Sequence, residues 1–483
     1  MMAKRRDILK LIGLAFAFSL LHAELLRAAS RVPIRSDKPN IIYLLADDLG
    51  YAELGCYGQT KIKTPHIDRL AAEGMRFLQH YSGSPVCAPS RCTLMTGLHT
   101  GHAQVRGNKQ IGGKEGWRLG STKGGQWPLE DGTVTIAKVL QDAGYVTGAF
   151  GKWGLGTVGS TGDPQKQGFD HFYGYICQRQ AHTYYPDHLW RDGRVEPISA
   201  NRDGAEQVYS HDLIANEALA FIAANRDRPF FCYVPFTIPH VAIQVPEDSL
   251  AQYRGKWPDP PYDGSKGYFP HPSPRAGYAA MVSRMDRDVG RIMDLLDTLN
   301  LKEKTLVVFT SDNGPTFNGG SDSAFFASAG PLRGLKTMVY EGGIRVPFIA
   351  RWPGKIEPGS ISQHVSAFWD FFPTCCDLLG VKVLEPLDGI SMLPALTGQP
   401  GQQQHDYLYW ELNGQQALRV GDYKAVRRKR GPIELYDLQN DIGEQQDIAA
   451  DHPAIVAKMK RLFESARNES SVFPLVRPKK IAG

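Results

Sequence analysis

The clearest structural signal in this chain of 483 residues is the run Asn40-Ile41-Ile42-Tyr43-Leu44-Leu45-Ala46, which Asp47-Asp48 follow directly. An unbroken apolar run of this kind is typical of a strand buried on both faces of a parallel sheet. Similar runs occupy residues 145–150, 230–236 and 305–310, and polar or charged residues follow each of them. Open α/β sheets bind their ligands beyond the carboxyl ends of their strands. We therefore expect these polar residues to gather at one site.

Helical patterns separate the strand-like runs. They cover residues 68–74, 134–143, 212–224 and 278–299. Strands that alternate with helices predict an α/β sandwich, in which helices flank a large and mostly parallel central sheet.

The pattern changes near residue 396. Short segments of alternating polarity follow at 406–412, 417–420 and 423–427, and an amphipathic helical pattern covers 453–467. These segments predict a small C-terminal antiparallel sheet with one covering helix. We therefore expect a main domain at 38–395 and a C-terminal subdomain at 396–483.

The first 29 residues have the pattern of an export signal of the twin-arginine type. Arg5-Arg6-Asp7-Ile8-Leu9-Lys10 precedes the apolar run 11–21, and small residues follow at 28–30. A bilayer span needs about 20 apolar residues, so this run is too short for a membrane anchor. We expect a periplasmic or secreted protein, cleaved near residues 28–30, with no stable membrane span after the signal is removed.

Composition narrows the class of partner. More than half of the formal net charge of +5 lies in residues 1–29, so the remaining chain is close to neutral. Nucleic acid is therefore not an expected partner, because phosphate binding needs a concentrated basic surface. The seven cysteines are too few and too scattered for a disulfide framework, and no Cys/His spacing indicates zinc.

Acidic and amide residues follow two of the predicted strands. Asp47-Asp48 and Asp312-Asn313 offer only oxygen ligands, which favour calcium or magnesium over zinc. Carboxylates held close together repel one another, and a divalent cation would stabilise them. The alternative is that each pair only ends a strand or begins a helix.

A second motif begins at Cys87. Cys87-Ala88-Pro89-Ser90-Arg91 opens a predicted helix, because Pro89 suits a first helical turn. Cys87 would then lie at the positive end of the helix dipole with Arg91 one turn away, a position that attracts an anion. The alternative is an ordinary free cysteine at a helix start.

Taken together, the motifs resemble those of the type I, formylglycine-dependent sulfatases, which are arylsulfatase-like members of the alkaline phosphatase superfamily. Cys87-x-Pro89-x-Arg91 with Thr96-Gly97 resembles the signature in which the cysteine is converted to Cα-formylglycine. Further matching segments occur in family order: Asp47-Asp48, Gly151-Lys152-Trp153, Pro239-His240, Asp312-Asn313-Gly314, Leu332-Arg333-Gly334-Leu335-Lys336 and Glu341-Gly342-Gly343-Ile344-Arg345.

The resemblance implies an alkaline phosphatase-like sandwich and a role for each matching residue. One calcium ion would be bound by Asp47, Asp48, Asp312, Asn313 and the modified Cys87. Arg91 would orient the formylglycine hydrate, Lys152 and Lys336 would hold sulfate oxygens, and His240 would lie on the leaving-group side. A formylglycine-generating or anaerobic sulfatase-maturing enzyme is the implied partner, and it would act before folding and export.

The chemistry of sulfate ester hydrolysis agrees with these roles. Calcium, Arg91, Lys152 and Lys336 would supply positive charge around the oxyanion. The hydrated aldehyde would attack sulfur and later expel sulfate, which an unmodified cysteine cannot do. His240 is the expected proton donor, because a sugar alcohol is a poor leaving group.

One position departs from the family pattern. Many members read Gly-Lys-Trp-His at the second motif, with the histidine contacting formylglycine and assisting sulfate release, whereas Gly154 stands here. The base for that step is therefore unassigned. His99, His102 and His182 are the histidines that could replace it.

The segment 178–190 reads as a loop rich in aromatic and hydrogen-bonding residues, and it resembles a segment of polysaccharide-directed bacterial sulfatases. We expect His182 to contact substrate and the substrate to be a sulfated carbohydrate, with aryl sulfates also hydrolysed. Ordinary loop packing is the alternative for this segment. A formylglycine-dependent phosphonate or phosphate ester hydrolase and a non-catalytic binder of sulfated glycans are the alternative functions.

Overall fold

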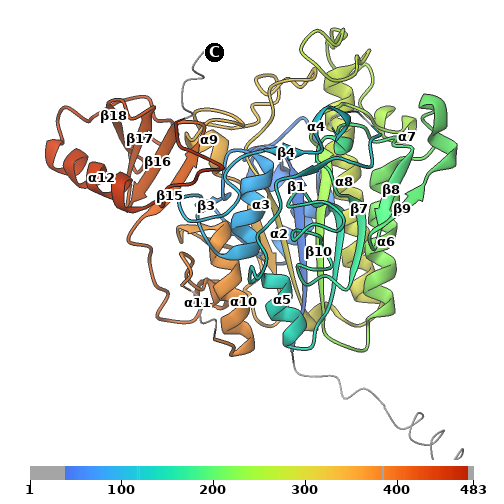
Figure 1. The fold of residues 1–483 in the computed structure, drawn as a ribbon, viewed down its shortest axis with the longest axis horizontal. Helices are drawn as coiled ribbons and strands as arrows, with labels where there is room; N and C mark the ends of the chain where they lie inside the picture. Colours follow the sequence, from blue (N-terminus) through green and yellow to red (C-terminus); the bar gives the residue numbers. More distant parts are fainter. Residues whose placement is uncertain (1–37, 117, 119, 383–385, 477–483) are drawn as a thin grey trace, which may run out of the picture.

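The computed structural model describes residues 38–476, apart from 117, 119 and 383–385. The predicted export signal at 1–29 lies outside the described residues. A ten-stranded sheet crosses the molecule between layers of helices, and a separate four-stranded sheet lies beside it near the C-terminal end (Figure 1). This arrangement confirms the predicted α/β sandwich with a small C-terminal antiparallel sheet.

The central sheet is mixed, with a parallel middle. The five adjacent strands in its middle run parallel to one another, and antiparallel pairs occur toward both edges. In spatial order the strands are β13 (Ser360–Ser362), β2 (Met75–Phe77), β12 (Phe348–Arg351), β11 (Thr305–Ser311), β1 (Asn40–Asp47), β10 (Phe230–Pro239), β6 (Val146–Lys152), β7 (His171–Tyr175), β8 (His188–Arg191) and β9 (Arg194–Pro197).

Strand β1 is buried on both faces because its side chains alternate between two hydrophobic cores. Ile42 and Leu44 pack in one core, beneath α2 (Pro65–Ala72), α6 (Ser210–Ala224) and α8 (Pro274–Thr298). Ile41 and Tyr43 pack in the other, beneath α3 (Cys87–Thr96), α5 (Ile136–Asp142) and α10 (Phe371–Leu379). The unbroken apolar run of the sequence therefore reflects a strand with no solvated face.

The parallel register brings the ends of the central strands together. Asp47, the last residue of β1, lies opposite Pro239 on β10, and Ala46 lies opposite Ser311 on β11. His240 and Asp312 come directly after these strands, so both lie at the same sheet edge as Asp47. The edge is the one at which the sequence predicted a site.

The C-terminal sheet contains β15 (Leu408–Leu412), β16 (Gln415–Val420), β17 (Tyr423–Arg428) and β18 (Ile433–Asp437), in that spatial order, with α12 (Pro453–Ser465) packed against it. Strand β18 was not predicted. One face of the sheet joins the main body, because Trp410 packs with Tyr81 and Trp369 and its indole nitrogen donates to the Ser82 carbonyl at 2.9 Å.

Short elements complete the fold. They are β3 (His80–Tyr81) with β14 (Ser366–Ala367), β4 (Gln110–Ile111) with β5 (Gly125–Gln126), α4 (Gly113–Gly116), α7 (Glu247–Leu250), α9 (Glu341–Ile344), α11 (Leu393–Thr397) and 3-10 turns at Gly55–Tyr57, Gln180–His182, Ser199–Gly204, Lys302–Lys304 and Phe368–Asp370. Within the part of the chain that the structure describes, no helix is both long enough and apolar enough to span a membrane.

The interpretation of 178–190 as a loop was wrong at its end. His188–Arg191 forms strand β8, which pairs with β9 through a tight turn at Asp192-Gly193. Both turn residues have positive φ, 48° and 77°. Asp-Gly between short alternating segments is the usual sequence of such a hairpin turn.

Candidate active site

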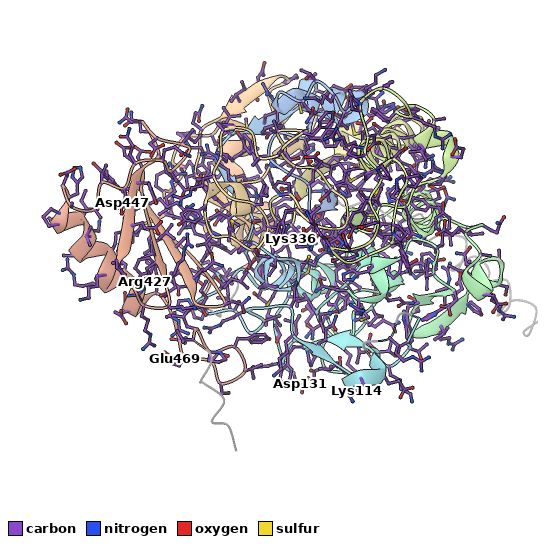
Figure 2. All side chains as sticks on the ribbon, turned by 90° about the horizontal axis from the view of Figure 1, so that it is seen from above. Lys114, Asp131, Lys336, Arg427, Asp447 and Glu469 are labelled. Carbon is purple, nitrogen blue, oxygen red and sulfur yellow. The ribbon has the colours of Figure 1, made fainter. Side chains whose placement is uncertain are left out.

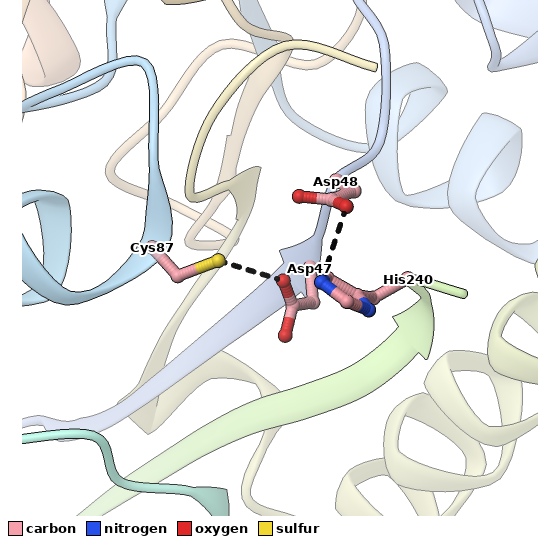
Figure 3. Close-up of side chains that lie close together, drawn as sticks. All are labelled: Asp47, Asp48, Cys87 and His240. Atoms are coloured by element: carbon pink, nitrogen blue, oxygen red, sulfur yellow. Dashed lines mark hydrogen bonds and ion pairs between the residues drawn. The ribbon is translucent and has the colours of Figure 1, made fainter. Parts of the chain in front are cut away.

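Four chemically active side chains converge where β1 ends (Figure 3). Asp47 is the last residue of β1 and Asp48 follows it, Cys87 begins α3, and His240 is the residue after β10. The Cys87 Sγ lies 3.4 Å from Asp47 Oδ1, and the His240 Nε2 lies 3.6 Å from Asp48 Oδ2. One ligand atom from each of the four residues lies within 4.8 Å of the others, so the group could hold a metal ion.

The end of β11 adds Asp312 and Asn313 to this cluster. The Asp48 backbone N–H donates to Asp312 Oδ1 at 3.2 Å, and the Asn313 amide nitrogen donates to Asp48 Oδ1 at 2.8 Å. Asp48 has a positive φ of 67°, which turns the chain sharply away from the strand. All four predicted oxygen ligands are therefore buried at one point.

Basic side chains surround the carboxylates. The Lys152 Nζ lies 2.5 Å from Asp47 Oδ2, and the Lys336 Nζ lies 2.7 Å from Asp48 Oδ2. From above, Lys336 lies toward the middle of the molecule, whereas Lys114 and Asp131 lie at its periphery (Figure 2). The Lys152 and Lys336 side chains are only 1% and 12% exposed and both aspartates are 0% exposed, so the charges are paired where an unpaired charge would be costly.

Arg91 lies on α3 and connects the ends of strands β6 and β11. Its Nε and Nη2 donate to Asp312 Oδ2 at 3.1 and 2.8 Å, and its Nη1 donates to the Lys152 carbonyl at 2.5 Å. The side chain is 0% exposed. A guanidinium suits this position because its planar fork can donate to several acceptors at fixed angles.

Burial and neighbouring charge shift the pKa values of the acids in opposite directions. Burial alone would raise the pKa of Asp47, but Lys152, with further help from His240 and Arg91, holds it well below its usual range. Burial, followed by the charge of Asp47, raises the pKa of Asp312 to about 6. Burial also raises the pKa of Asp48. Crowded carboxylates of this kind favour a bound cation.

The donor set fits a calcium ion. The Asn313 Oδ1 is buried and has no hydrogen-bond partner among the described residues, although an amide oxygen normally finds one. It lies on the residue next to Asp312, and its amide nitrogen contacts Asp48. Carboxylate oxygens with one amide oxygen are hard ligands of the type that calcium prefers.

Cys87 is buried in a setting that disfavours its thiolate. The residue is 1% exposed, and burial, followed by the charge of Asp47, raises the pKa of its thiol. The backbone N–H of the next residue, Ala88, donates to the Asn108 side-chain oxygen at 2.9 Å. Since the thiolate is the nucleophilic form of cysteine, an unmodified Cys87 would be a poor nucleophile here.

A cavity of about 220 Å³ opens onto this cluster. The His182 ring stacks on His240, with ring centroids 5.0 Å apart, and Tyr268 contacts both rings edge-on. The cavity is lined by Val86, Cys87, Asn108, Gln110, Gln126, Gln178, His182, His240, Tyr268, Phe317, Asn318, Lys336 and Thr337. His182 therefore lies in the wall of the cavity that contains Cys87.

His99 and His102, the other two histidines proposed to replace the family histidine missing at position 154, lie elsewhere. His99 and His102 stack on each other, and the His102 Nδ1 lies 2.9 Å from Asp388. Neither lines the cavity at Cys87. At Gly154 the backbone φ is +79°, and a Cβ there would lie 2.9 Å from the Gln178 Nε2.

Sequence reasoning missed several residues of the cavity wall. Gln126, Tyr268 and Asn318 lie in no recognisable motif, and single polar residues in loops give no signal of their own. Gln178 falls at the start of the segment predicted to face substrate, but only His182 was named there.

A second and larger cavity, of about 710 Å³, adjoins the first. Asn108 and Gln110 line both. Its other walls come from the chain near Arg106 and Lys109, from Glu411–Asn413 of the C-terminal sheet and from 471–475. The Lys109 Nζ lies 3.8 Å from the Trp127 ring centroid, and Phe473 packs edge-on against that ring.

Comparison with known proteins gives the family. A family profile described as Sulfatase matches residues 39–381. The chain belongs to the sulfatase family. It is a sulfuric ester hydrolase with the alkaline phosphatase-like fold expected from the sequence, and the predicted family membership is confirmed. A second profile, described as N-sulphoglucosamine sulphohydrolase, C-terminal, matches residues 335–469 of this sulfatase.

Individual relatives align along most of the sulfatase. The N-acetylgalactosamine-6-O-sulfatase of Bacteroides thetaiotaomicron is 29% identical, and the alignment covers 89% of this chain and 94% of the relative. Arylsulfatase A of Homo sapiens is 32% identical over 88% of this chain and 87% of its own. The crystal structure of Ps i-CgsB in complex with k-i-k-neocarrahexaose aligns with a TM-score of 0.73 at 30% identity, covering 89% and 92% of the two chains.

Proposed function

We propose that this sulfatase removes sulfate from a sulfated carbohydrate, using calcium and a formylglycine made from Cys87. The observation that carries the proposal is the position of Cys87. It lies at the start of α3, in contact with Asp47, within a cluster of paired cations and carboxylates that a cavity reaches.

Calcium would be held by Asp47, Asp48, Asp312 and Asn313, together with the modified residue 87. The ion would supply positive charge beside the sulfate oxygens. The free Asn313 oxygen and the mutual repulsion of the carboxylates support this assignment. Arg91, Lys152 and Lys336 balance the carboxylates, so a bound divalent ion would leave surplus positive charge for an anionic substrate.

Formylglycine, as a hydrated aldehyde, would supply the hydroxyl nucleophile that the buried thiol cannot provide. The modification must precede folding, because Cys87 is 1% exposed in the folded chain and a maturing enzyme could not reach it. A formylglycine-generating or anaerobic sulfatase-maturing enzyme is therefore the proposed partner.

The basic residues would bind and orient the sulfate group. Lys336 lines the cavity, and Lys152 lies at the end of β6 beside Asp47, so their ammonium groups can reach sulfate oxygens from two directions. Arg91 would be a positioning residue. It is hydrogen bonded to both Asp312 and the Lys152 backbone, and so fixes the proposed metal ligand Asp312 relative to the proposed sulfate-binding residue Lys152.

His240 is the proposed proton donor to the leaving oxygen. Its Nδ1 is hydrogen bonded to the Val241 carbonyl, so Nδ1 carries a proton and Nε2 is the atom available for proton transfer. Burial, followed by the charge of Lys336, lowers the pKa of His240 well below its usual value. With this lowered pKa, Nε2 holds no proton in the substrate-free chain, so the proposed role requires the negative charge of the bound sulfate ester to raise the pKa of His240.

The surroundings of the cluster support a carbohydrate substrate. His182 and Tyr268 present ring edges and polar atoms to the cavity, and the adjoining larger cavity adds Phe473 and Lys109. Relatives named for a sugar sulfatase and for a hexaose complex agree with this class. Because the two cavities share Asn108 and Gln110, an oligosaccharide could extend from one into the other.

Export and domain organisation remain part of the proposal. We propose a twin-arginine signal at 1–29, a catalytic domain at 38–395 and a C-terminal subdomain at 396–483, with the mature enzyme in the periplasm or outside the cell. Degradation of an external sulfated polysaccharide would suit that location.

The experiment that tests the function is sulfate release from a panel of sulfated oligosaccharides and one aryl sulfate. The enzyme is co-produced with a maturing enzyme and assayed in calcium, and the Cys87→Ala variant provides the control. Release by wild type alone supports the proposal. Hydrolysis of an aryl phosphonate without any sulfate release would favour the phosphonate hydrolase alternative.

A further inference from the structure

Two glutamine side chains in the cavity wall are not explained by the roles assigned so far. Gln126, from β5, is 1% exposed, and Gln178, which follows β7, is 4% exposed. Both line the cavity at Cys87. The Nε2 of each is buried without a hydrogen-bond partner among the residues the structure describes. Buried amide donors are normally paired, so two such donors in one wall indicate a missing acceptor.

The glutamines are joined to each other, and the contact fixes the orientation of one amide. The Gln178 backbone N–H donates to Gln126 Oε1 at 2.8 Å. The oxygen of Gln126 is therefore occupied within the protein, and its NH₂ group is the end left over. The two side chains therefore have N–H donors left unpaired by the described residues, whereas the Gln126 oxygen already accepts a hydrogen bond.

The position of Gln178 relates the pair to the sulfate-binding side of the site. Gln178 follows β7, which pairs with β6, and Lys152 at the end of β6 lies opposite Tyr175. A Cβ at Gly154 would lie 2.9 to 3.1 Å from the Gln178 amide nitrogen and its carbons, so Gln178 fills the space beside residue 154. The glycine and the glutamine thus form one packing unit next to Lys152.

We propose that the carboxamides of Gln126 and Gln178 form a donor pair that binds oxygens of the substrate's sulfate group. This inference rests on the proposed function. The oxygens of a sulfate ester are acceptors, which matches the two unpaired amide donors of Gln126 and Gln178. The amides do not titrate, so they bind and position the group and transfer no proton. Gly154 leaves room for this arrangement, which a side chain at 154 would displace.

The test uses inorganic sulfate as the probe, measured by calorimetry on the unmatured chain in calcium. Gln126→Glu keeps an oxygen for the Gln178 N–H and removes the amide donor. Gln178→Met keeps the volume beside Gly154 and removes the amide. Each should weaken sulfate binding by about tenfold or more, as expected for a hydrogen bond to a charged group. Gln110→Glu, in the same wall, controls for added charge.

Turnover provides a second readout. With matured enzyme and an aryl sulfate, both variants should raise KM or lower kcat, and inorganic sulfate should inhibit them less than it inhibits wild type. Thermal unfolding confirms that each variant is folded.

Unchanged sulfate affinity in folded variants of an active enzyme would overturn the donor pair while leaving the sulfatase function intact. An equal loss in Gln110→Glu, with unchanged sulfate affinity in Gln178→Met, would also overturn it, because the added charge alone would then explain the effect of Gln126→Glu. Altered KM for sugar sulfates with unaltered sulfate binding would assign the amides to the sugar. A wild-type chain that neither binds sulfate nor releases it would instead refute the proposed function.

Discussion

Arg91→Lys tests whether geometry, and not charge alone, holds the active site together. The substitution keeps a positive charge at residue 91 but replaces a planar fork by a single ammonium group. Arg91 donates through Nε and Nη2 to Asp312 and through Nη1 to the Lys152 carbonyl, and its side chain is 0% exposed. A lysine at this position could keep only one of these acceptors.

The expected cost follows from the bonds lost. Hydrogen bonds that involve a charged group contribute about 1.5–3 kcal/mol each. Losing two of them should lower the free energy of unfolding by about 3 kcal/mol or more, since the buried Lys152 carbonyl also loses its donor. Because Lys152 and Asp312 lose their common support, kcat should fall by about 100-fold.

The assay is denaturant unfolding of the unmatured chain, with the midpoint and slope compared between variants. Arg69→Lys is the matched control. Arg69 also contacts an aspartate, Asp294, at 2.8 Å, but its side chain is 37% exposed. That exposed pair should contribute less than about 1 kcal/mol. If Arg91→Lys were as stable and as active as Arg69→Lys, the argument from fork geometry would be refuted.

Four further outcomes are expected. Cys87→Ala should abolish turnover and leave the unfolding midpoint near wild type; turnover near wild type would exclude the formylglycine mechanism. Calcium should raise the thermal midpoint of wild type, since a ligand of the native state stabilises it, and Asn313→Ala should reduce that rise; equal shifts in the two proteins would contradict the metal assignment. The hydrogen bond that His171 Nε2 donates to the Glu217 carboxylate, at 2.9 Å, raises the pKa of His171 in the folded chain. Its stabilisation is therefore complete below the unfolded pKa of about 6.5 and is lost as pH rises through the folded pKa, so the stability deficit of His171→Gln should be larger at pH 6 than at pH 9. A deficit independent of pH would show that His171 acts by packing alone. Phe473→Ala and Lys109→Ala should raise KM for sulfated oligosaccharides and leave aryl sulfate turnover unchanged; equal effects on both substrates would remove the larger cavity from the binding site.

The sequence predicts the central sheet because burial on both faces leaves a direct trace in the residue pattern. Ile42 and Leu44 face one core while Ile41 and Tyr43 face the other, so the interior positions of β1, residues 41–46, are all apolar. The same logic places Asp47 and Asp312 at one edge, because parallel strands end together. Motif order then adds Cys87, and the structure brings these residues into one cluster.

The remainder depends on contacts that no local pattern encodes. Strand β8 was missed because the whole segment 178–190 was interpreted as a loop, although its aromatic residues favour a strand and Asp192-Gly193 signalled a hairpin. Gln126 and Gln178 lie 52 residues apart and meet through one backbone hydrogen bond. Such a pair becomes visible only when the unpaired donors are examined in three dimensions.

The most direct test of the account is peptide mass spectrometry on the segment that contains Cys87, from protein produced with a maturing enzyme. Conversion of the thiol to an aldehyde predicts a peptide lighter by about 18 Da in enzyme that releases sulfate. An intact thiol at Cys87 in enzyme that releases sulfate at full rate would contradict the account.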